Sequence, residues 1–380
     1  MKFLIVRLGA LGDVVHAIPV AAALRRAFPA ARLDWLVSAR HREILDLVPV
    51  IDRRLVIDGA ASDMAQRFPP SLRLGEARRS AERGGGDPAG GRSPEGLRHI
   101  LGAIRELRRS RYDVAIDLQG LLKSALLARS SRASRVIGFA TSYLRERLAR
   151  PFYTDVYDPG CGGIYDPRET RHVVQINLGL LQPLGLSATT PEFPIDRVES
   201  AVARTVSGQT RGRYALLNPG ARWPNKRWPP SRFGLVAAVL RERYGLTSIA
   251  LWGDDERPLA EEVVAHAAGA ALVSPPASIA DLVALARGAV IMVSGDTGPI
   301  HLAAAVGTPV VGIFGPTRPA RNGPWSPDDV TVSRDEVCQC HHLRRCRLET
   351  MCLLDIVVAD VVAAVDRRLA AGDCPLVRDV

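Results

Sequence analysis

The sequence contains no uninterrupted apolar run of about 18 residues, which excludes an ordinary transmembrane helix. Aromatic residues make up only 5% of the chain, so its cores must be built mainly from Leu, Val, Ala and Ile. Lysine occurs only at positions 2, 123 and 226, and arginine supplies nearly all of the positive charge. A chain that uses lysine so sparingly can keep it for places where a compact point charge matters.

The residues that are present favour two domains and an acidic partner. The length of 380 residues is natural for two domains, and a hydrophobic content of 47% is enough for sizeable cores. The net charge of +10 favours binding to phosphate groups, nucleic acid or an anionic membrane surface, without choosing among them.

The first residues are typical of a buried strand. Residues 1–6 are mostly apolar, but Arg7 and Asp13 interrupt the run too early for a signal peptide. We therefore expect the chain to stay in the cytoplasm, where its six cysteines remain reduced and form no disulfide framework.

The apolar pattern alternates between strands and helices. Residues 2–7 and 32–38 are strand-like, and between them lie a glycine turn and a helical stretch at 14–28, which is a βαβ opening to a parallel sheet. The alternation begins again at residue 214, after a proline-rich linker. The pattern predicts two doubly wound α/β halves, with ligands bound in a cleft beyond the carboxyl ends of the strands.

Two segments interrupt this alternation. Residues 83–92 are rich in glycine and predict a flexible loop, which a basic helix at 94–110 follows. The arginines between residues 67 and 111 fit attachment to an anionic inner leaflet, and they fit a solvated helix face equally well. Residues 141–170 favour irregular structure, and the last long helix is expected at 353–370.

Residues 7–16 connect the first strand to the first helix. Gly9 and Gly12 let the backbone turn tightly, and the next helix would point its N-terminus at an anion. The three-glycine dinucleotide fingerprint is absent. Asp13 has two open interpretations, a helix N-cap or a general base, and His16 fits packing or orienting better than catalysis.

Residues 117–124 also lead from a strand into a helix. The pattern places Asp117, Gln119, Lys123 and Ser124 near one edge of the sheet. A ligand-binding edge fits these residues, but a strand-end cap with a solvated lysine is slightly favoured on the residues alone.

Residues 218–229 form a polar, cationic loop after another strand. Lys226 and Arg227 suit a diphosphate, because ammonium and guanidinium groups both bind phosphate oxygens. A basic surface loop over packed Trp223 and Trp228 fits the same residues, and the two interpretations are compatible.

Residues 294–301 combine glycines with polar side chains at a strand end. Gly295 and Gly298 allow a turn whose N–H groups face an anion, and Thr297 adds a hydroxyl. His301 follows one helical turn later. A lone histidine is usually a satisfied core residue, but this position makes His301 a candidate ligand-binding group.

Residues 338–352 hold four cysteines and two adjacent histidines. A zinc ion could be bound there. The spacing matches none of the common zinc templates, so we favour the absence of a metal and reduced thiols that pack the crossing to the last helix. The candidate zinc ligands are Cys338, Cys340, Cys346 and Cys352.

Taken in order, these motifs resemble those of the ADP-heptose:lipopolysaccharide heptosyltransferases, glycosyltransferase family 9. Residues 117–125 are similar to the family's central N-domain segment, 218–228 to its donor loop, and 296–301 to its most recognisable signature. Residues 312–317 are similar to the strand and turn that follow. The similarity to the opening signature of the family rests on Gly12, Asp13, Val14, His16 and Pro19.

The resemblance implies a GT-B fold, with two Rossmann-like domains facing a cleft. Residues 1–187 would bind the acceptor, residues 188–352 the nucleotide sugar, and residues 353–380 would form a C-terminal helix and tail that pack back toward the first domain. The reaction implied is an inverting transfer of heptose from ADP-heptose to the Kdo and heptose inner core of lipopolysaccharide, without a metal or another cofactor.

The resemblance also implies roles for single residues. Asp13 would deprotonate the acceptor hydroxyl, and Lys226 would neutralise the leaving diphosphate. The enzyme would lie on the cytoplasmic face of the inner membrane, act on a lipid A–Kdo type acceptor and bind no nucleic acid. Further donor-binding positions are Arg227, Asp296, Thr297, Gly298, His301, Asn218 and Gly220, and acceptor-binding positions are Gly12, Gln119, Lys123 and Arg105.

Three alternatives remain. The first is an enzyme of the same family that uses another nucleotide sugar or acceptor. The cysteine cluster resembles that of second-heptose and core-extending enzymes, whereas the opening motif is closer to that of first-heptose enzymes. A nucleotide-dependent oxidoreductase would need the glycine fingerprint and an acidic residue after the second strand, and strand two ends at Ser38. A non-catalytic polyanion binder fits the charge but would need more aromatic stacking residues.

Overall fold

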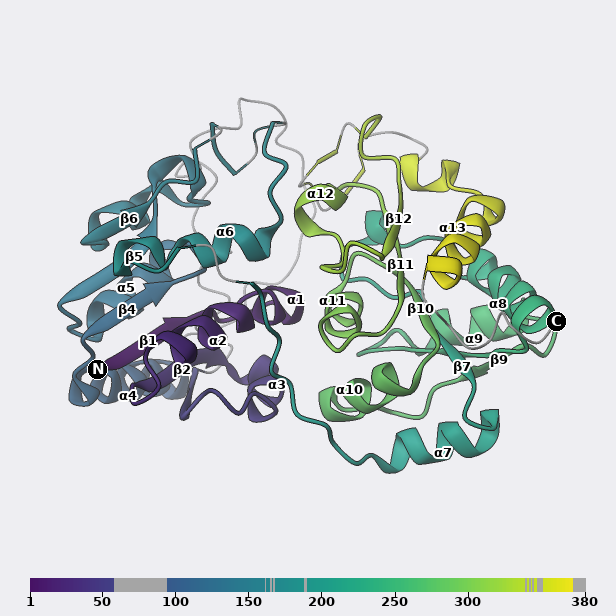
Figure 1. Cartoon of the computed structure of the whole chain (residues 1–380), viewed down its shortest axis with the longest axis horizontal. Helices are drawn as coiled ribbons and strands as arrows, with labels where there is room; N and C mark the ends of the chain where they lie inside the picture. The colour runs from purple at the N-terminus through teal and green to yellow at the C-terminus, as the bar shows by residue number, and fades with distance from the viewer. Residues whose placement is uncertain are drawn as a thin grey trace. The chain divides into compact units, whose positions relative to one another are not determined.

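The computed structural model describes residues 1–57, 94–160, 162–164, 166, 168–187, 190–338, 340–341, 343, 345–346 and 351–371, without the side chains of residues 94–101. The predicted flexible loop at 83–92 lies outside these residues. The described chain forms two compact units (Figure 1). The first comprises Met1–Gly9, Val20–Glu169 and Asn177–Thr190, and the second Ala10–Pro19, Thr170–Ile176 and Pro191–Val380.

The first unit is built on a six-stranded sheet in which every neighbouring pair is parallel. The spatial order is β3 (Arg53–Ile57), β2 (Arg32–Ser38), β1 (Lys2–Val6), β4 (Val114–Asp117), β5 (Arg135–Phe139) and β6 (Asp155–Tyr157). Its central strands β1 and β4 are short apolar runs that are buried apart from Lys2 at the start of β1, as a sheet covered on both faces requires.

Helices connect these strands. The basic helix predicted at 94–110 forms as α4, whereas the single helix predicted at 14–28 is two helices that part near Ala17. The helices of this part of the chain are α2 (Ile18–Ala27), α3 (Arg42–Asp46), α4 (Pro94–Ser110), α5 (Leu122–Ser130) and α6 (Val173–Gly179), with α2 and α6 each crossing from one unit to the other.

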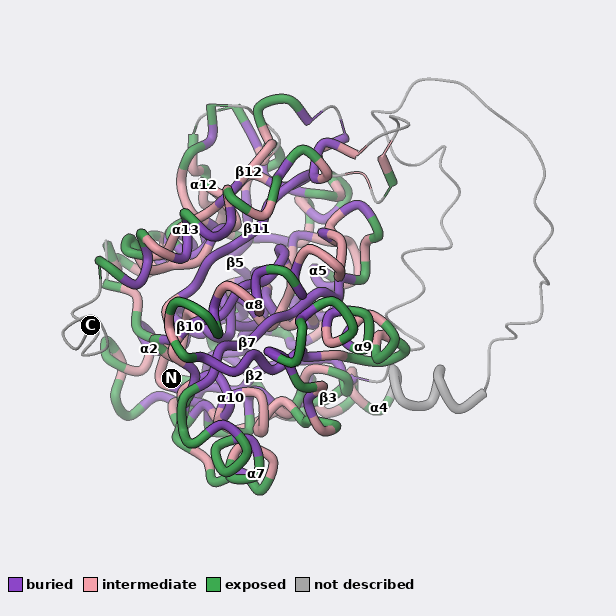
Figure 2. The backbone as a smooth tube through the Cα atoms, turned by 90° about the vertical axis from the view of Figure 1, so that its right-hand side faces the viewer, coloured by how far each residue is buried: buried purple, intermediate pink, exposed green. Residues whose placement is uncertain are grey.

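The second unit repeats the same topology in a second parallel sheet. Its strands β7, β10 and β11 are buried along their whole length (Figure 2). The spatial order is β12 (Val330–Ser333), β11 (Val310–Phe314), β10 (Ile291–Gly295), β7 (Tyr214–Asn218), β8 (Thr247–Ala250) and β9 (Ala271–Val273).

Side chains of β7 alternate between two separate cores, because successive residues of a strand point to opposite faces. Ala215 and Leu217 pack in a cluster with residues of α8, α9 and α13. Tyr214 and Leu216 pack with residues of α7, α10 and α11 on the other face. The helices are α1 (Leu11–Val15), α7 (Ala201–Thr210), α8 (Pro230–Tyr244), α9 (Arg257–Ala265), α10 (Ile279–Gly288), α11 (Gly298–Ala305), α12 (Pro319–Asn322) and α13 (Val358–Ala371).

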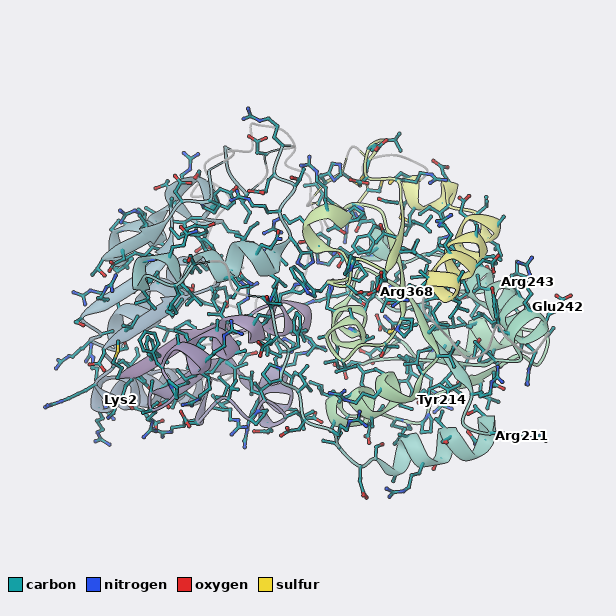
Figure 3. All side chains as sticks on the ribbon, viewed as in Figure 1. Lys2, Arg211, Tyr214, Glu242, Arg243 and Arg368 are labelled. Carbon is teal, nitrogen blue, oxygen red and sulfur yellow. The ribbon has the colours of Figure 1, made fainter. Side chains whose placement is uncertain are left out.

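The last helix, α13, packs within the second unit. Val361 and Val365 belong to the same core cluster as α8 and β11. Arg368 (labelled in Figure 3) donates from Nε to Oδ1 of Asp329 at 2.7 Å, just before β12. The main described contacts of α13 are with β11, β12 and α8 of the second unit. The packing of 353–380 back toward the first domain stays a prediction.

The unit boundaries differ from the predicted domains in one instructive place. The change of unit after Thr190 lies close to the boundary predicted after residue 187. Residues 10–19, which the sequence assigns to the first domain, group with the second unit because α1 packs on α11. Among the described residues, no helix is long and apolar enough to span a membrane.

Candidate functional site

The site lies at the carboxyl ends of β7 and β10, the two adjacent strands from which the second sheet is wound in opposite directions. Ligands of doubly wound sheets bind at this switch point. Asn218 ends β7 and is paired in register with Ser294 of β10. Its Nδ2 donates to Ser294 Oγ at 3.0 Å and to Thr297 Oγ1 at 2.9 Å, so Asn218 joins the two strand ends.

Asp296 is the centre of the site. Its side chain is 7% exposed, and both carboxylate oxygens accept hydrogen bonds from side chains. Lys226 Nζ and Thr317 Oγ1 each lie 2.5 Å from Oδ2, and His301 Nε2 lies 3.1 Å from Oδ1. The three donors come from the loop after β7, the turn after β11 and helix α11, so a single carboxylate connects three segments.

The electrostatics of this cluster favour the ionised form of Asp296. Burial alone would raise the pKa of the carboxyl, but Lys226 and His301 outweigh that effect and hold it well below its usual range. The Lys226 ammonium also lies 4.8 Å from the centre of the Trp223 ring, a cation–π distance. Because an ammonium has three donors and Asp296 uses one, Lys226 can still bind an anion.

The loop that carries Lys226 is held by its neighbours. Asn225 is buried and donates from Nδ2 to the Leu343 carbonyl at 2.9 Å. Arg227 donates from Nε to the Ala221 carbonyl at 2.7 Å and from Nη2 to Glu256 at 3.2 Å. The guanidinium predicted to meet a diphosphate is therefore engaged by a carboxylate.

Helix α11 begins directly after Asp296. Its N-cap residue Thr297 makes no side-chain capping bond, because the hydroxyl accepts from Asn218 instead. The helix buries His301 one turn later, and His301 Nδ1 has no hydrogen-bond partner among the residues that the structure describes. The unpaired His301 Nδ1 and the uncapped N-terminus of α11 are polar groups that a ligand could satisfy, and a closed apolar core would leave them unsatisfied.

Helix α1 packs on α11 through two close glycine contacts. A Cβ on Gly12 would lie 2.5 Å from Cδ2 of His301, and a Cβ on Gly298 would lie 2.9 Å from Cβ of Leu11. Each glycine therefore makes room for a side chain of the other helix. This packing brings residues 12–16 to the Asp296 cluster.

Asp13 is half-buried in the first turn of α1. Its Oδ2 accepts from the backbone N–H of Ala10 at 3.1 Å. Ala10 is the N-cap residue and Asp13 is the third residue of the helix, so Asp13 caps α1 from N3 and not from the N-cap position that the sequence suggested. Asp13 belongs to the same unit as Lys226 and Asp296, and capping from N3 is compatible with a role as general base.

Rings continue the cluster beyond His301. The His16 ring centroid is 4.3 Å from that of His301 and 5.4 Å from that of His172, and His172 lies 5.1 Å from Trp325. Sequence reasoning missed Thr317, His172 and Trp325. Thr317 follows a buried strand end and could have been found by that position, whereas nothing in the sequence marks His172 or Trp325.

The predicted acceptor-binding residues Gln119, Lys123 and Arg105 lie in the first unit, and Gly12 lies in the second. Gln119 accepts from the backbone N–H of Leu8 at 2.8 Å, so its amide ties two strand ends. Lys123 is half-buried on α5. Arg105 is exposed on α4, where it lines a surface hollow with Arg109.

Asp117 serves the structure of the first unit. Its fully buried carboxylate accepts from Tyr153 Oη at 2.7 Å, Ser124 Oγ at 2.8 Å and the Gln119 backbone N–H at 2.9 Å. Burial raises the pKa of this carboxyl despite these bonds. The strand-end cap favoured by the sequence is the role that these contacts support.

The four cysteines that the sequence offers as candidate zinc ligands pack together as a small core. Sγ of Cys338 and Sγ of Cys340 are 3.4 Å apart, Cys352 is buried beside them, and Cys346 packs against the three. Burial raises the pKa of the Cys340 thiol to about 12, so it stays protonated at neutral pH. Within the described ranges, no group of three or more His, Cys, Asp or Glu side chains is arranged to hold a metal ion.

Comparison with known proteins agrees with this geometry. Lipopolysaccharide heptosyltransferase 1 of Pseudomonas aeruginosa is 31% identical over 89% of this chain and 85% of its own. Lipopolysaccharide heptosyltransferase 3 of Escherichia coli K12 is 24% identical over 96% of both chains. The solved structure of E. coli heptosyltransferase WaaC with ADP superposes with a TM-score of 0.71 at 22% identity and covers 97% of this chain and 100% of that one.

Two six-stranded parallel sheets of the same winding define the GT-B fold, and a polar cluster lies at the switch point of the second sheet. The model of glycosyltransferase family 9 (heptosyltransferase) matches residues 100–352, and the chain belongs to this family. The resemblance inferred from the motifs is confirmed, and the enzyme is a heptosyltransferase of the lipopolysaccharide core.

Proposed function

We propose that this enzyme transfers a heptose from ADP-heptose to the Kdo and heptose inner core of lipopolysaccharide, with inversion at the anomeric carbon. The observation that carries the proposal is the Asp296 cluster, in which Lys226, Thr317 and His301 converge on one buried carboxylate at the switch point of the second sheet. Such a cluster holds a cation in place before the donor arrives.

The proposed reaction uses Asp13 as the base and Lys226 as the cation. An acceptor hydroxyl attacks the anomeric carbon of the heptose from the face opposite to ADP, and its proton passes to the carboxylate of Asp13. The bond between the anomeric carbon and the diphosphate oxygen breaks, and its electron pair leaves with ADP. Lys226 neutralises the charge that develops on the diphosphate. The mechanism needs no metal ion, and chelation should leave turnover unchanged.

Other residues bind the donor. The start of α11, at Thr297 and Gly298, offers backbone N–H groups to the phosphates, because no side chain caps it. His301 Nδ1 can accept a hydrogen bond from a sugar hydroxyl while Nε2 is held by Asp296. Asn218 and Gly220 shape the loop at the end of β7, and Arg227 would have to leave Glu256 to reach a phosphate.

The acceptor is acidic, which matches the net charge of +10. We propose that Gly12, Gln119, Lys123 and Arg105 bind its phosphates and acidic sugars. The enzyme would work on the cytoplasmic face of the inner membrane, where arginine-rich segments are attracted to anionic lipid.

A matrix of donors and acceptors tests the proposal with purified protein. Donors are ADP-heptose, ADP-glucose and UDP-glucose, and acceptors are Kdo-terminated lipid A and the same core carrying one heptose. ADP release and product mass are measured. We expect transfer from ADP-heptose at least tenfold faster than from the other donors.

The comparison of the two acceptors shows at which step of core assembly the enzyme acts, a point on which its relatives, heptosyltransferase 1 and heptosyltransferase 3, leave a choice. Preference for the Kdo-terminated acceptor would make this a first-heptose enzyme, and preference for the heptosylated core would make it a later one. Preference for ADP-glucose or UDP-glucose over ADP-heptose would overturn the donor assignment.

A further inference from the structure

A row of rings leads away from the Asp296 cluster within the second unit. His301 is hydrogen-bonded to Asp296, and the His16 ring packs on it with centroids 4.3 Å apart. His172 then meets His16 at 5.4 Å with planes at 87°, the edge-to-face geometry that aromatic rings favour. Trp325 completes the row at 5.1 Å from His172, again close to edge-to-face.

Both nitrogens of His172 are occupied by the backbone. Nε2 lies 2.9 Å from the Gly323 carbonyl, and Nδ1 accepts from the N–H of Val174 at 3.2 Å. These partners fix the tautomer, because Nε2 must carry the hydrogen and Nδ1 the lone pair. Burial lowers the pKa of His172 to about 4, so the ring is neutral at neutral pH.

Neither ring nitrogen of His172 is therefore available to bind a substrate or to transfer a proton. The ring of His172 itself has no role so far, and it is held in one orientation between His16 and Trp325. A ring fixed in this way can set the position of the His16 ring that packs against it.

His16 lies at the end of helix α1, and the position of this helix depends on its packing. Helix α1 has only five residues, which is too short to be stable alone, so its placement comes from packing. One side of the packing is the Gly12 and Gly298 contact with α11. The other is His16, the C-cap residue of α1, which lies between the rings of His301 and His172.

We propose that His172 is a positioning residue, whose ring edge holds His16 and, through it, helix α1, so that Asp13 is presented to the acceptor hydroxyl. The inference rests on the proposed function of Asp13 and adds a residue that acts on it through another. The ring contacts described for His172 are with His16 and Trp325, and its ring nitrogens bond to the backbone of Gly323 and Val174. Its effect is therefore expected on the rate of transfer rather than on nucleotide binding.

Two substitutions separate the ring from its hydrogen bonds. His172→Phe keeps an aromatic edge against His16 and loses the bonds to Gly323 and Val174. His172→Gln keeps an amide donor for the Gly323 carbonyl and loses the ring. His172→Ala removes both. His266→Ala is the matched control, because His266 is exposed at the end of α9 and its ring bonds only to the Glu262 carbonyl, at 2.9 Å, among the contacts that the structure gives.

We expect kcat to fall at least tenfold in His172→Gln and His172→Ala, because small misplacements of a catalytic group are costly. His172→Phe should stay within about threefold of the wild type, and ADP affinity should change less than about threefold in all three variants. If His172→Gln keeps kcat while His172→Phe loses it, the hydrogen bond to Gly323 matters and the ring does not. That result, or normal kcat in His172→Ala, overturns the inference.

A measurement without turnover separates this inference from the proposed function. The ring signals of His16, assigned by substitution in labelled protein, should be preserved in His172→Phe and displaced in His172→Gln. If they behave so while the wild type transfers no heptose from ADP-heptose, the proposed function fails and the contact with His16 stands. If heptose is transferred but His16 does not respond, the positioning role fails alone.

Discussion

Asp296 shows how one buried charge can organise several residues. A carboxylate that is 7% exposed would be costly without partners, and here a lysine, a hydroxyl and an imidazole satisfy it. The same bonds hold Lys226 where a diphosphate can reach it. The three partners therefore stabilise the fold and prepare the donor site at the same time.

Removal of the Lys226 charge should affect both roles. In Lys226→Met the buried Asp296 loses its largest favourable Coulombic interaction, so we expect ADP affinity to fall at least tenfold and the protein to lose about 3 kcal/mol of stability. Titration calorimetry and urea unfolding measure the two effects. Lys2→Met is the matched control, since Lys2 is exposed and its ammonium donates to the Ser110 carbonyl at 3.3 Å.

The same substitution should change the response to acid. A carboxyl whose folded pKa is depressed contributes stability above its unfolded pKa of about 3.9 and loses it as the pH falls toward the folded value. In the wild type, the loss from Asp296 is therefore confined to below about pH 4. In Lys226→Met the pKa of Asp296 rises, so this contribution should be lost at a higher pH. An unchanged acid-unfolding profile would contradict the role given to Lys226.

At the scale of single residues, strand-end motifs made much of the site predictable. Lys226, Thr297 and His301 were found because glycines and polar residues follow apolar strands, and parallel strands end at one edge of a sheet. Asp296 was named only through the family resemblance. His172 could not be found in either way. It meets His16 across more than 150 residues of sequence, and its N-cap position on α6 resembles many others.

Among the elements, α1 is a helix of only five residues that depends on close packing against α11. Gly12→Ala would place a methyl group 2.5 Å from Cδ2 of His301, so α1 and α11 must move apart. We expect a loss of about 1–3 kcal/mol in thermal or urea unfolding and a lower kcat. Gly208→Ala on the exposed face of α7 is the control, because nothing lies within 4 Å of a Cβ there.

The control should be neutral or stabilising, by up to about 1 kcal/mol, because alanine is the better helix former. If Gly12→Ala were as stable and as active as the control, α1 would not depend on close contact with His301. The packing argument for grouping Ala10–Pro19 with the second unit would then be wrong.

Some elements followed from the sequence and others did not. The strand at 32–38 and the helix at 94–110 have the predicted bounds. Edge strands β6 and β12 were missed, since three or four residues at an edge need no continuous apolar run. Helix α7 was missed because Thr205, Ser207 and Gly208 are weak helix formers, and the Ser200 N-cap compensates for them.

At the scale of the whole chain, the fold class was predictable because each half repeats one pattern, strand then helix, with the same strand order. The assignment of residues to the two units was harder to predict from the sequence. Sequence order places α1 with the first sheet, and only its packing on α11 groups it with the second. The reaction class followed from the ordered motifs, while the donor and the acceptor depend on resemblance.

Helix α1 and the switch point of the second sheet together form the site proposed for sugar transfer. Asp13→Asn removes the base from this site, because the amide can still accept the Ala10 N–H but cannot take a proton. Heptose transfer from ADP-heptose and, separately, ADP affinity are measured. We expect kcat to fall at least 10²-fold with ADP affinity unchanged. Transfer at the wild-type rate would show that Asp13 is not the base.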